Sequence, residues 1–187
     1  DYVPTLEEFG GDGWTPWMHR TAIIKTQARE VVENVADVAH FPNVHGNQVL
    51  SFEATFDGPR ATQATRTSGY DKRGRLTKQR TVATYHGPAI QFSEMDGEYP
   101  TIILNAHVPI DEHELELRMG LLVRGIDYGT KLGRTLGEMW IDALQEGYFQ
   151  DVAIWEHKRW QDKPMLCDGD GPIDDLRKWY AQFYPAS

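Results

Sequence analysis

The sequence predicts an α+β fold in which an antiparallel sheet is followed by one long carboxy-terminal helix. Between Val49 and Val123, about six strand-like runs alternate with Asp-Gly, Gly-Pro and charged turns, a pattern typical of a meandering antiparallel sheet. From Gly129 to Trp160 the chain lacks proline, and its apolar residues recur at helical intervals. One helix cannot fill the concave face of a curved sheet, so we expect a cavity between the two layers.

The other elements are shorter. Alternating β-branched and polar residues predict a first strand within residues 17–29. Apolar residues at helical spacing predict a helix from Val31 to His40, which Pro42 ends because the α region is disfavoured for the residue before a proline. The tail combines a glycine-rich turn at 168–172 with a short aromatic helix from Leu176 to Phe183. The runs of the predicted sheet include Ala61–Ser68, Thr77–His86, Ile90–Glu94, Thr101–Val108 and Glu114–Val123.

Length and composition favour one acidic domain. With 187 residues, 40% of them hydrophobic, the chain can form one well-buried core, and we expect a single domain over residues 1–187. A formal net charge of −9 disfavours binding to nucleic acid or to anionic lipid. No apolar run approaches the roughly 20 residues of a membrane-spanning helix, so we expect no membrane span.

Cysteine usage limits the chemistry that this chain can carry alone. Cys167 is the only cysteine, so the chain cannot form an internal disulfide, a cysteine-rich zinc module or a complete iron–sulfur cluster. A reducing cytoplasm is the location that we expect. Because the sequence begins with Asp1 and not with methionine, we also expect it to be a piece of a longer protein.

Two histidines near the end of the predicted helix are candidate metal ligands. On an unbroken helix, His40 and His45 would point about 140° apart, since each residue turns the helix by about 100°. A break at Pro42 would let His40, from the last helical turn, and His45, from the loop, face one point. Asp37 precedes His40 by three residues, where its carboxylate could accept the ring N–H that a metal does not use. Alternatively, the histidines are an ordinary pair, one bonded to backbone carbonyls and one solvated.

The long helix contributes a carboxylate in an unusual position. Steps of about 100° from Leu144 place Asp151 in the middle of a narrow apolar and aromatic stripe. A buried carboxylate without a partner is costly, so Asp151 should be paired or bound to a cation. A salt bridge to Arg124, Arg134 or another basic neighbour is the alternative. The other members of the stripe are Gly133, Gly137, Trp140, Tyr148 and Trp155.

Two imidazoles and one carboxylate, with open coordination positions, favour oxygen chemistry at a non-haem Fe(II). Zinc is the alternative metal, although the His-Glu-x-x-His motif of many hydrolytic zinc sites is absent from the sequence. Three hypotheses therefore stay open: an oxygenase domain, a zinc hydrolase, and a lipid- or sterol-binding module that uses the cavity without chemistry.

These residues resemble the iron site of Rieske non-haem iron oxygenases. The tail is similar, more narrowly, to the 3-ketosteroid 9α-hydroxylase oxygenase group, to which the cholesterol 7-desaturases are related. The site motif is Glu33-Asn34-x-x-Asp37-x-x-His40-x4-His45-Gly46, followed about a hundred residues later by Asp151-Val152-x-Ile154-Trp155. The tail motifs are Lys163-Pro164-Met165-Leu166, Asp170-Gly171-Pro172 and Arg177-Lys178-Trp179-Tyr180-x-Gln182-Phe183-Tyr184.

The resemblance implies a START-like helix-grip fold and a mononuclear Fe(II) held by His40, His45 and Asp151. It names Asp37 and Asn34 as candidate catalytic residues: Asp37 would link the iron to a Rieske [2Fe-2S] cluster in an adjacent subunit of a homotrimer, and Asn34 would lie near the pocket. The implied activity is insertion of oxygen from O2 into a C–H bond of a steroid or similar polycyclic apolar substrate.

The resemblance also implies an electron supply that this chain does not contain. Electrons would come from a ferredoxin and its reductase through the Rieske cluster. The Cys-x-His and Cys-x-x-His motifs that hold such a cluster are absent from the sequence. We therefore expect that the amino-terminal Rieske domain is missing from this chain, either removed or naturally lost, and that the cluster is supplied from outside.

Overall fold

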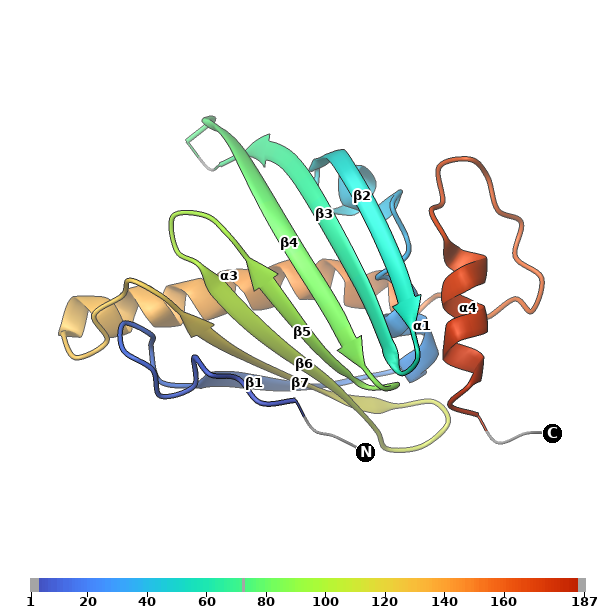
Figure 1. Cartoon of the computed structure of the whole chain (residues 1–187), viewed down its shortest axis with the longest axis horizontal. Coiled ribbons are helices and arrows are strands. Elements are labelled where there is room, and N and C mark those ends of the chain that lie inside the picture. The colour runs from blue at the N-terminus through green and yellow to red at the C-terminus, as the bar shows by residue number, and fades with distance from the viewer. Residues whose placement is uncertain (1–3, 72, 185–187) are drawn as a thin grey trace.

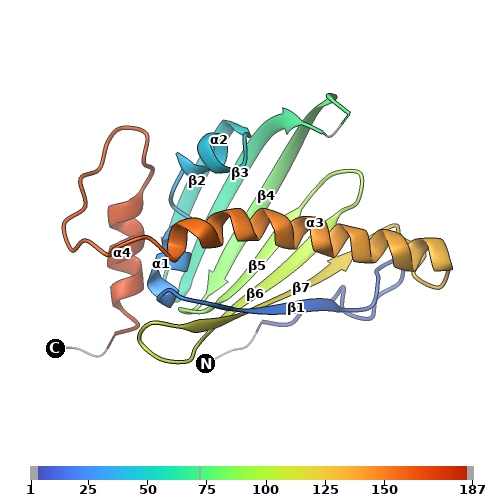
Figure 2. The ribbon, with the colours of Figure 1, turned by 180° about the vertical axis from the view of Figure 1, so that it is seen from behind.

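In the computed structural model, which describes residues 4–71 and 73–184, one open antiparallel sheet is crossed by a long helix, α3 (Figure 1, Figure 2). The strand order is β1-β7-β6-β5-β4-β3-β2. The strands are β1 (Met18–Ile24), β2 (Gln48–Asp57), β3 (Arg60–Tyr70), β4 (Leu76–His86), β5 (Ile90–Met95), β6 (Thr101–Pro109) and β7 (Leu115–Val123). The helices are α1 (Ala28–Glu33), α2 (His40–Val44), α3 (Lys131–Trp155) and α4 (Ile173–Ala181). The predicted α+β class, with a sheet wrapped around a long helix, is confirmed.

The strands that follow one another from β2 to β7 pair as an antiparallel meander, and β1 joins the far edge beside β7. Successive side chains of a strand point to opposite faces, so every second residue faces the helices. In β3 these inward positions are Ala61, Gln63 and Thr65, which are all buried. The inner face of the sheet thus carries polar as well as apolar side chains.

Helix α3 is held against the sheet by two apolar clusters. Its first half packs through Ile141 against residues of β1, β6 and β7, and its second half packs through Val152 and Trp155 against β1, β7 and α1. The expected end at Trp160 is wrong, because the helix stops at Trp155. Beyond it the chain turns, and Lys158 forms ion pairs with the buried carboxylates of α1.

The single helix expected from Val31 to His40 is also wrong. Helix α1 ends at Glu33, and a separate short helix, α2, begins at His40. Between them, Val35 and Ala36 turn into the core beside α4. Pro42 lies in the first turn of α2, where the amide hydrogen that proline lacks would have no partner within the helix. The break therefore comes before His40 and not after it.

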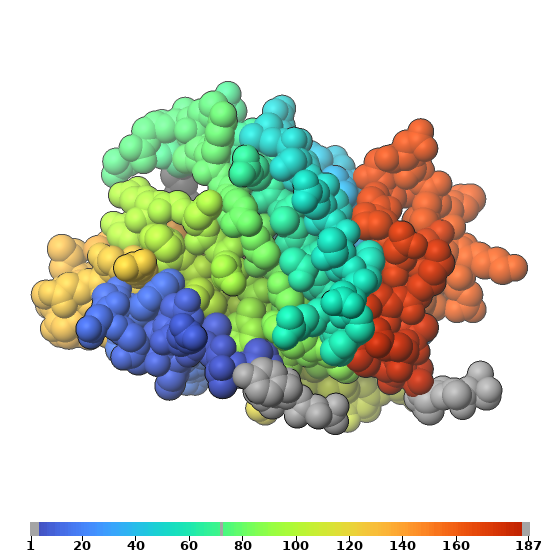
Figure 3. Space-filling model, viewed as in Figure 1, coloured from blue at the N-terminus to red at the C-terminus, as the bar shows by residue number. Residues whose placement is uncertain are grey.

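The tail packs beside β2 and closes one end of the core (Figure 3). Helix α4 buries Ile173, Leu176 and Trp179 in the cluster that also holds Ala36. Just before α4, Gly171 has a φ of 74°, and a Cβ atom there would lie 2.3 Å from the carbonyl oxygen of Ala36. Only glycine fits this position, because it tolerates positive φ and carries no side chain. The tail thus packs directly against the segment between α1 and α2.

None of the helices in the described ranges is long and apolar enough to span a membrane.

His107 of β6 is buried on the inner face of the sheet, against the ring of Tyr85. Its burial predicts that the stability of the fold depends on pH. In the described part of the chain, neither of its ring nitrogens has a hydrogen-bond partner. Burial lowers the pKa of His107 from 6.5 to about 4. As the pH falls from 6.5 toward 4, the unfolded chain takes up a proton that the folded chain refuses, so stability falls. We expect His107 alone to lower the free energy of unfolding by roughly 2–3 kcal/mol over this interval.

Urea denaturation at neutral pH and near pH 4 would measure this loss. The variant His107→Leu should lose less stability on acidification than the wild type by that amount. The variant His113→Leu, in an exposed loop, should behave like the wild type. Equal pH dependence in the wild type and His107→Leu would contradict the assignment.

Candidate metal centre

A cavity of about 400 Å³ lies between the inner face of the sheet and the helices. This volume is within the range of about 300–1,000 Å³ that is typical of small-molecule sites. Apolar side chains, including Val31, Leu144 and Trp155, form part of its wall, and polar side chains of β3, β5 and β6 form another part. The space that the sequence predicted between sheet and helix is therefore present.

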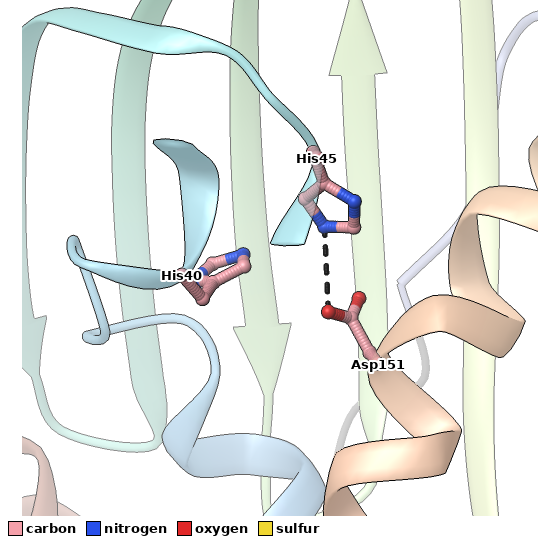
Figure 4. A group of neighbouring side chains, drawn as sticks. All are labelled: His40, His45 and Asp151. Atoms are coloured by element: carbon pink, nitrogen blue, oxygen red, sulfur yellow. Dashed lines mark ion pairs between the residues drawn. The ribbon is translucent and has the colours of Figure 1, made fainter. Parts of the chain in front are cut away.

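His40, His45 and Asp151 meet at this cavity (Figure 4). One potential ligand atom from each lies within 4.8 Å of the others. His40 is the first residue of α2, His45 directly follows α2, and Asp151 lies in the last part of α3. The imidazole centroids are 5.3 Å apart, and both rings lie beside the carboxylate of Asp151. The structure thus brings together the three residues that the sequence singled out as metal ligands.

The ring of His40 is oriented by the backbone. Its Nδ1 lies 2.5 Å from the carbonyl oxygen of Asp37, which can only accept, so Nδ1 carries the hydrogen and Nε2 is left with a free lone pair. Burial lowers the pKa of His40, which favours the neutral ring that a metal requires. The expectation that the carboxylate of Asp37 orients this ring is wrong, since that carboxylate accepts the backbone N–H of His40 at 3.2 Å.

Asp151 is a buried carboxylate whose negative charge is only partly compensated by its neighbours. Its exposed fraction is 6%. Its Oδ1 lies 3.3 Å from Nε2 of His45, but within the described residues it has no well-aligned hydrogen-bond donor. The nearby carboxylate is the main reason why the pKa of His45 is raised. No lysine or arginine in the described ranges forms an ion pair with Asp151, and Arg134 instead donates to backbone carbonyls at the start of α3.

The donor set fits a divalent metal. Oδ1 of Asp151, which has no well-aligned hydrogen-bond donor among the described residues, is the kind of buried group that a cation would compensate. The 3.3 Å between Nε2 of His45 and Oδ1 of Asp151 fits two ligands that share one ion, each about 2.0–2.2 Å from it. The other separations, of up to 4.8 Å, would have to shorten when an ion binds. Two imidazoles and one carboxylate suit Fe(II), and they also suit zinc.

The two other candidate residues flank this centre. Asn34, the residue that follows α1, lies in the cavity wall. Asp37 is half-buried in the turn that leads to His40. The structure places both close to the three clustered residues, and their expected catalytic roles stay predictions.

Sequence reasoning missed a polar group in the same cavity wall. Asn105 of β6 has no exposed surface, and its Nδ2 donates to Oε1 of Gln91 at 3.1 Å and to the hydroxyl of Tyr148. Within the described ranges, Oδ1 of Asn105 has no partner. The period of two in β6 could have identified this residue, because Asn105 shares the inward face with the buried Ile103 and His107.

Comparison with known proteins decides the family. The family model for the 3-ketosteroid 9α-hydroxylase C-terminal domain matches residues 1–184. This chain belongs to that family. The resemblance of this chain to the 3-ketosteroid 9α-hydroxylase oxygenase group, first indicated by the site motif and the tail motifs, is confirmed.

Curated relatives agree with the family model. The chain is 33% identical over 198 residues to the oxygenase component of a 3-ketosteroid-9-alpha-monooxygenase from Rhodococcus rhodochrous, with 97% of this chain and 50% of the relative covered. It is 31% identical over 111 residues to a cholesterol 7-desaturase from Caenorhabditis elegans, with 58% of this chain and 24% of the relative covered. The chain spans about half the length of the monooxygenase components that it matches.

Solved structures share the fold at low sequence identity. NdmA from Pseudomonas putida CBB5 matches with a TM-score of 0.70 and 12% identity, over 96% of this chain and 53% of that protein. Dicamba monooxygenase bound to 3,6-dichlorosalicylic acid matches with a TM-score of 0.68 and 12% identity, over 97% of this chain and 62% of that protein. These likenesses establish the helix-grip fold of the family domain and nothing finer.

Proposed function

We propose that this chain is the catalytic domain of an oxygenase that inserts oxygen from O2 into a C–H bond of a steroid or similar polycyclic apolar compound. The observation that carries the proposal is the convergence of His40, His45 and Asp151 at a largely apolar cavity. The family context supports it, because curated relatives are oxygenase components of monooxygenases. An oxidoreductase is thus the enzyme class that the relatives support.

In this proposal, His40, His45 and Asp151 hold a mononuclear Fe(II), which supplies the redox chemistry for O2 when it is bound. The backbone carbonyl of Asp37 keeps Nε2 of His40 free for the metal. Burial of Asp151 excludes water from one side of the centre, and a dry site strengthens electrostatic interactions within it.

The cavity wall would position the substrate. Val31, Leu144 and Trp155 offer apolar contacts to a ring system, whereas Asn105 and Gln91 offer hydrogen bonds to a polar substituent. A few polar groups in a mainly apolar pocket are the usual means of fixing the orientation of such a ligand. Asn34 would contact the substrate from the end of α1.

Electrons must reach this centre from outside the chain. A Rieske [2Fe-2S] cluster needs two cysteines, and Cys167 is the only cysteine of this sequence. We propose that a Rieske domain faces this site in a homotrimer. A ferredoxin and its reductase in the cytoplasm would supply the Rieske cluster with electrons. Asp37, half-buried beside His40, is our candidate for the link between cluster and iron.

Metal analysis tests the proposal directly. Protein reconstituted with Fe(II) under anaerobic conditions should hold one iron per chain, and His40→Ala should lose most of it, because one of the three protein ligands is gone. The matched control is His113→Ala, which removes an exposed histidine and should leave the iron content unchanged. Full iron binding by His40→Ala would contradict the assignment.

Turnover separates the competing functions. With a Rieske protein and reductant added, the oxygenase hypothesis requires that steroid oxidation stops when O2 or reductant is withheld. A zinc hydrolase would act without either. A sterol-binding module would bind sterol equally well in the wild type and in His40→Ala, with no product formed.

A further inference from the structure

His45 is held by two consecutive residues of α3, one at each ring nitrogen. Oε1 of Gln150 lies 3.0 Å from Nδ1, and Oδ1 of Asp151 lies 3.3 Å from Nε2. The side chain of Gln150 is exposed to solvent and also lines the cavity, so this contact lies where the cavity opens. Among the described residues, these are the hydrogen bond and the ion pair that join the side chain of His45 to α3.

The chemistry of imidazole gives the contact with Gln150 a specific consequence. A metal bound at Nε2 requires the hydrogen of the neutral ring to be on Nδ1, and that N–H needs an acceptor. For His40 the acceptor is a backbone carbonyl, which side-chain substitution does not remove. For His45 the acceptor is the side-chain oxygen of Gln150.

We infer that Gln150 is a positioning residue of the metal centre, which fixes the tautomer and rotation of His45 so that Nε2 faces the ion. This inference rests on the proposed metal site and names a residue that supports it from outside the ligand set. Because Gln150 and Asp151 are adjacent, one turn of α3 provides both the ligand Asp151 and the group that orients the ligand His45. Loss of such an orienting partner typically costs 10–100-fold in metal affinity.

Titration of the full metal-free chain with Co(II) under anaerobic conditions tests this role. The visible absorption of bound Co(II) reports both affinity and ligand geometry. We expect Gln150→Leu, which removes the acceptor, to weaken Co(II) binding about 10–100-fold and to change the spectrum. We expect Gln150→Glu, whose carboxylate still accepts, to bind at least as tightly as the wild type. The matched control is Gln145→Leu, on the same helix but beside β1, which should change neither affinity nor spectrum.

Thermal melting of the metal-free proteins separates positioning from a structural role. Because the Gln150 side chain is exposed, Gln150→Leu should melt at the wild-type temperature without metal. Wild-type affinity and spectrum in Gln150→Leu would overturn the inference and leave the metal site standing. So would Gln150→Glu binding as weakly as Gln150→Leu. Absence of Co(II) and Fe(II) binding in the wild type would overturn the proposed function, and the inference with it.

Discussion

Replacing Asp151 by asparagine is expected to abolish metal binding while leaving the metal-free fold at least as stable as the wild type. Asparagine has nearly the same size but lacks the negative charge that attracts a cation. Asp151 is 6% exposed, and its Oδ1 lacks an aligned donor in the described structure, so this charge costs stability when no ion is bound. Removing it relieves this cost but also loses the attraction to His45, so we expect the free energy of unfolding to rise by no more than about 1 kcal/mol.

Urea denaturation without metal, together with an iron titration, would measure both effects. The matched control is Asp142→Asn on the same helix. Asp142 is exposed and paired with Arg20 at 2.9 Å, so its loss should cost no more than about 1 kcal/mol and leave metal binding unchanged. If Asp151→Asn lost several kcal/mol of stability and kept its metal, Asp151 would be a structural residue and the metal centre would be misassigned.

Glu33→Gln is expected to cause a large loss of stability, although Glu33 lies outside the metal centre. Glu33 is 7% exposed, and its two carboxylate oxygens each lie 2.7 Å from a cation, Lys158 or Arg177. Removing one partner of a buried ion pair leaves the other charge uncompensated. We expect a loss of about 3 kcal/mol, at the lower end of the usual range because Lys158 keeps its pair with Glu30.

The same ion pairs set a pH dependence. Burial alone would raise the pKa of Glu33, but hydrogen bonds from Arg177 and Lys158 outweigh burial, and its pKa lies below the model-peptide value of 4.5. The stabilisation is therefore present above pH 4.5 and is lost as the pH falls through the lower pKa of the folded state.

Denaturation at neutral and acidic pH would test both statements about Glu33. The difference between the wild type and Glu33→Gln should shrink on acidification. Asp175→Asn is the control, because Asp175 and Lys178 form an exposed pair whose loss should cost less than about 1 kcal/mol. Equal stability of Glu33→Gln and the wild type at neutral pH would contradict the expectation.

Patterns of neighbouring residues predicted the sheet, the long helix and the burial of Asp151. These features depend on local periodicity: alternation along strands, and a stripe on one face of α3. Tertiary packing determined the rest. Val35 and Ala36 continue a helical pattern in sequence, yet the cluster beside α4 draws them inward and ends α1 early. The orientation of His45 depends on Gln150, 105 positions away, and local spacing carries no information about that contact.

The fit between Gly171 and the carbonyl of Ala36 has a consequence for how such domains diverge. The carboxy-terminal tail packs against the segment that leads to Asp37 and His40. The tail itself contains none of the proposed ligands. Substitutions confined to the tail could therefore change which first-row metal the site prefers, or how fast that metal exchanges, while the three ligands stay the same.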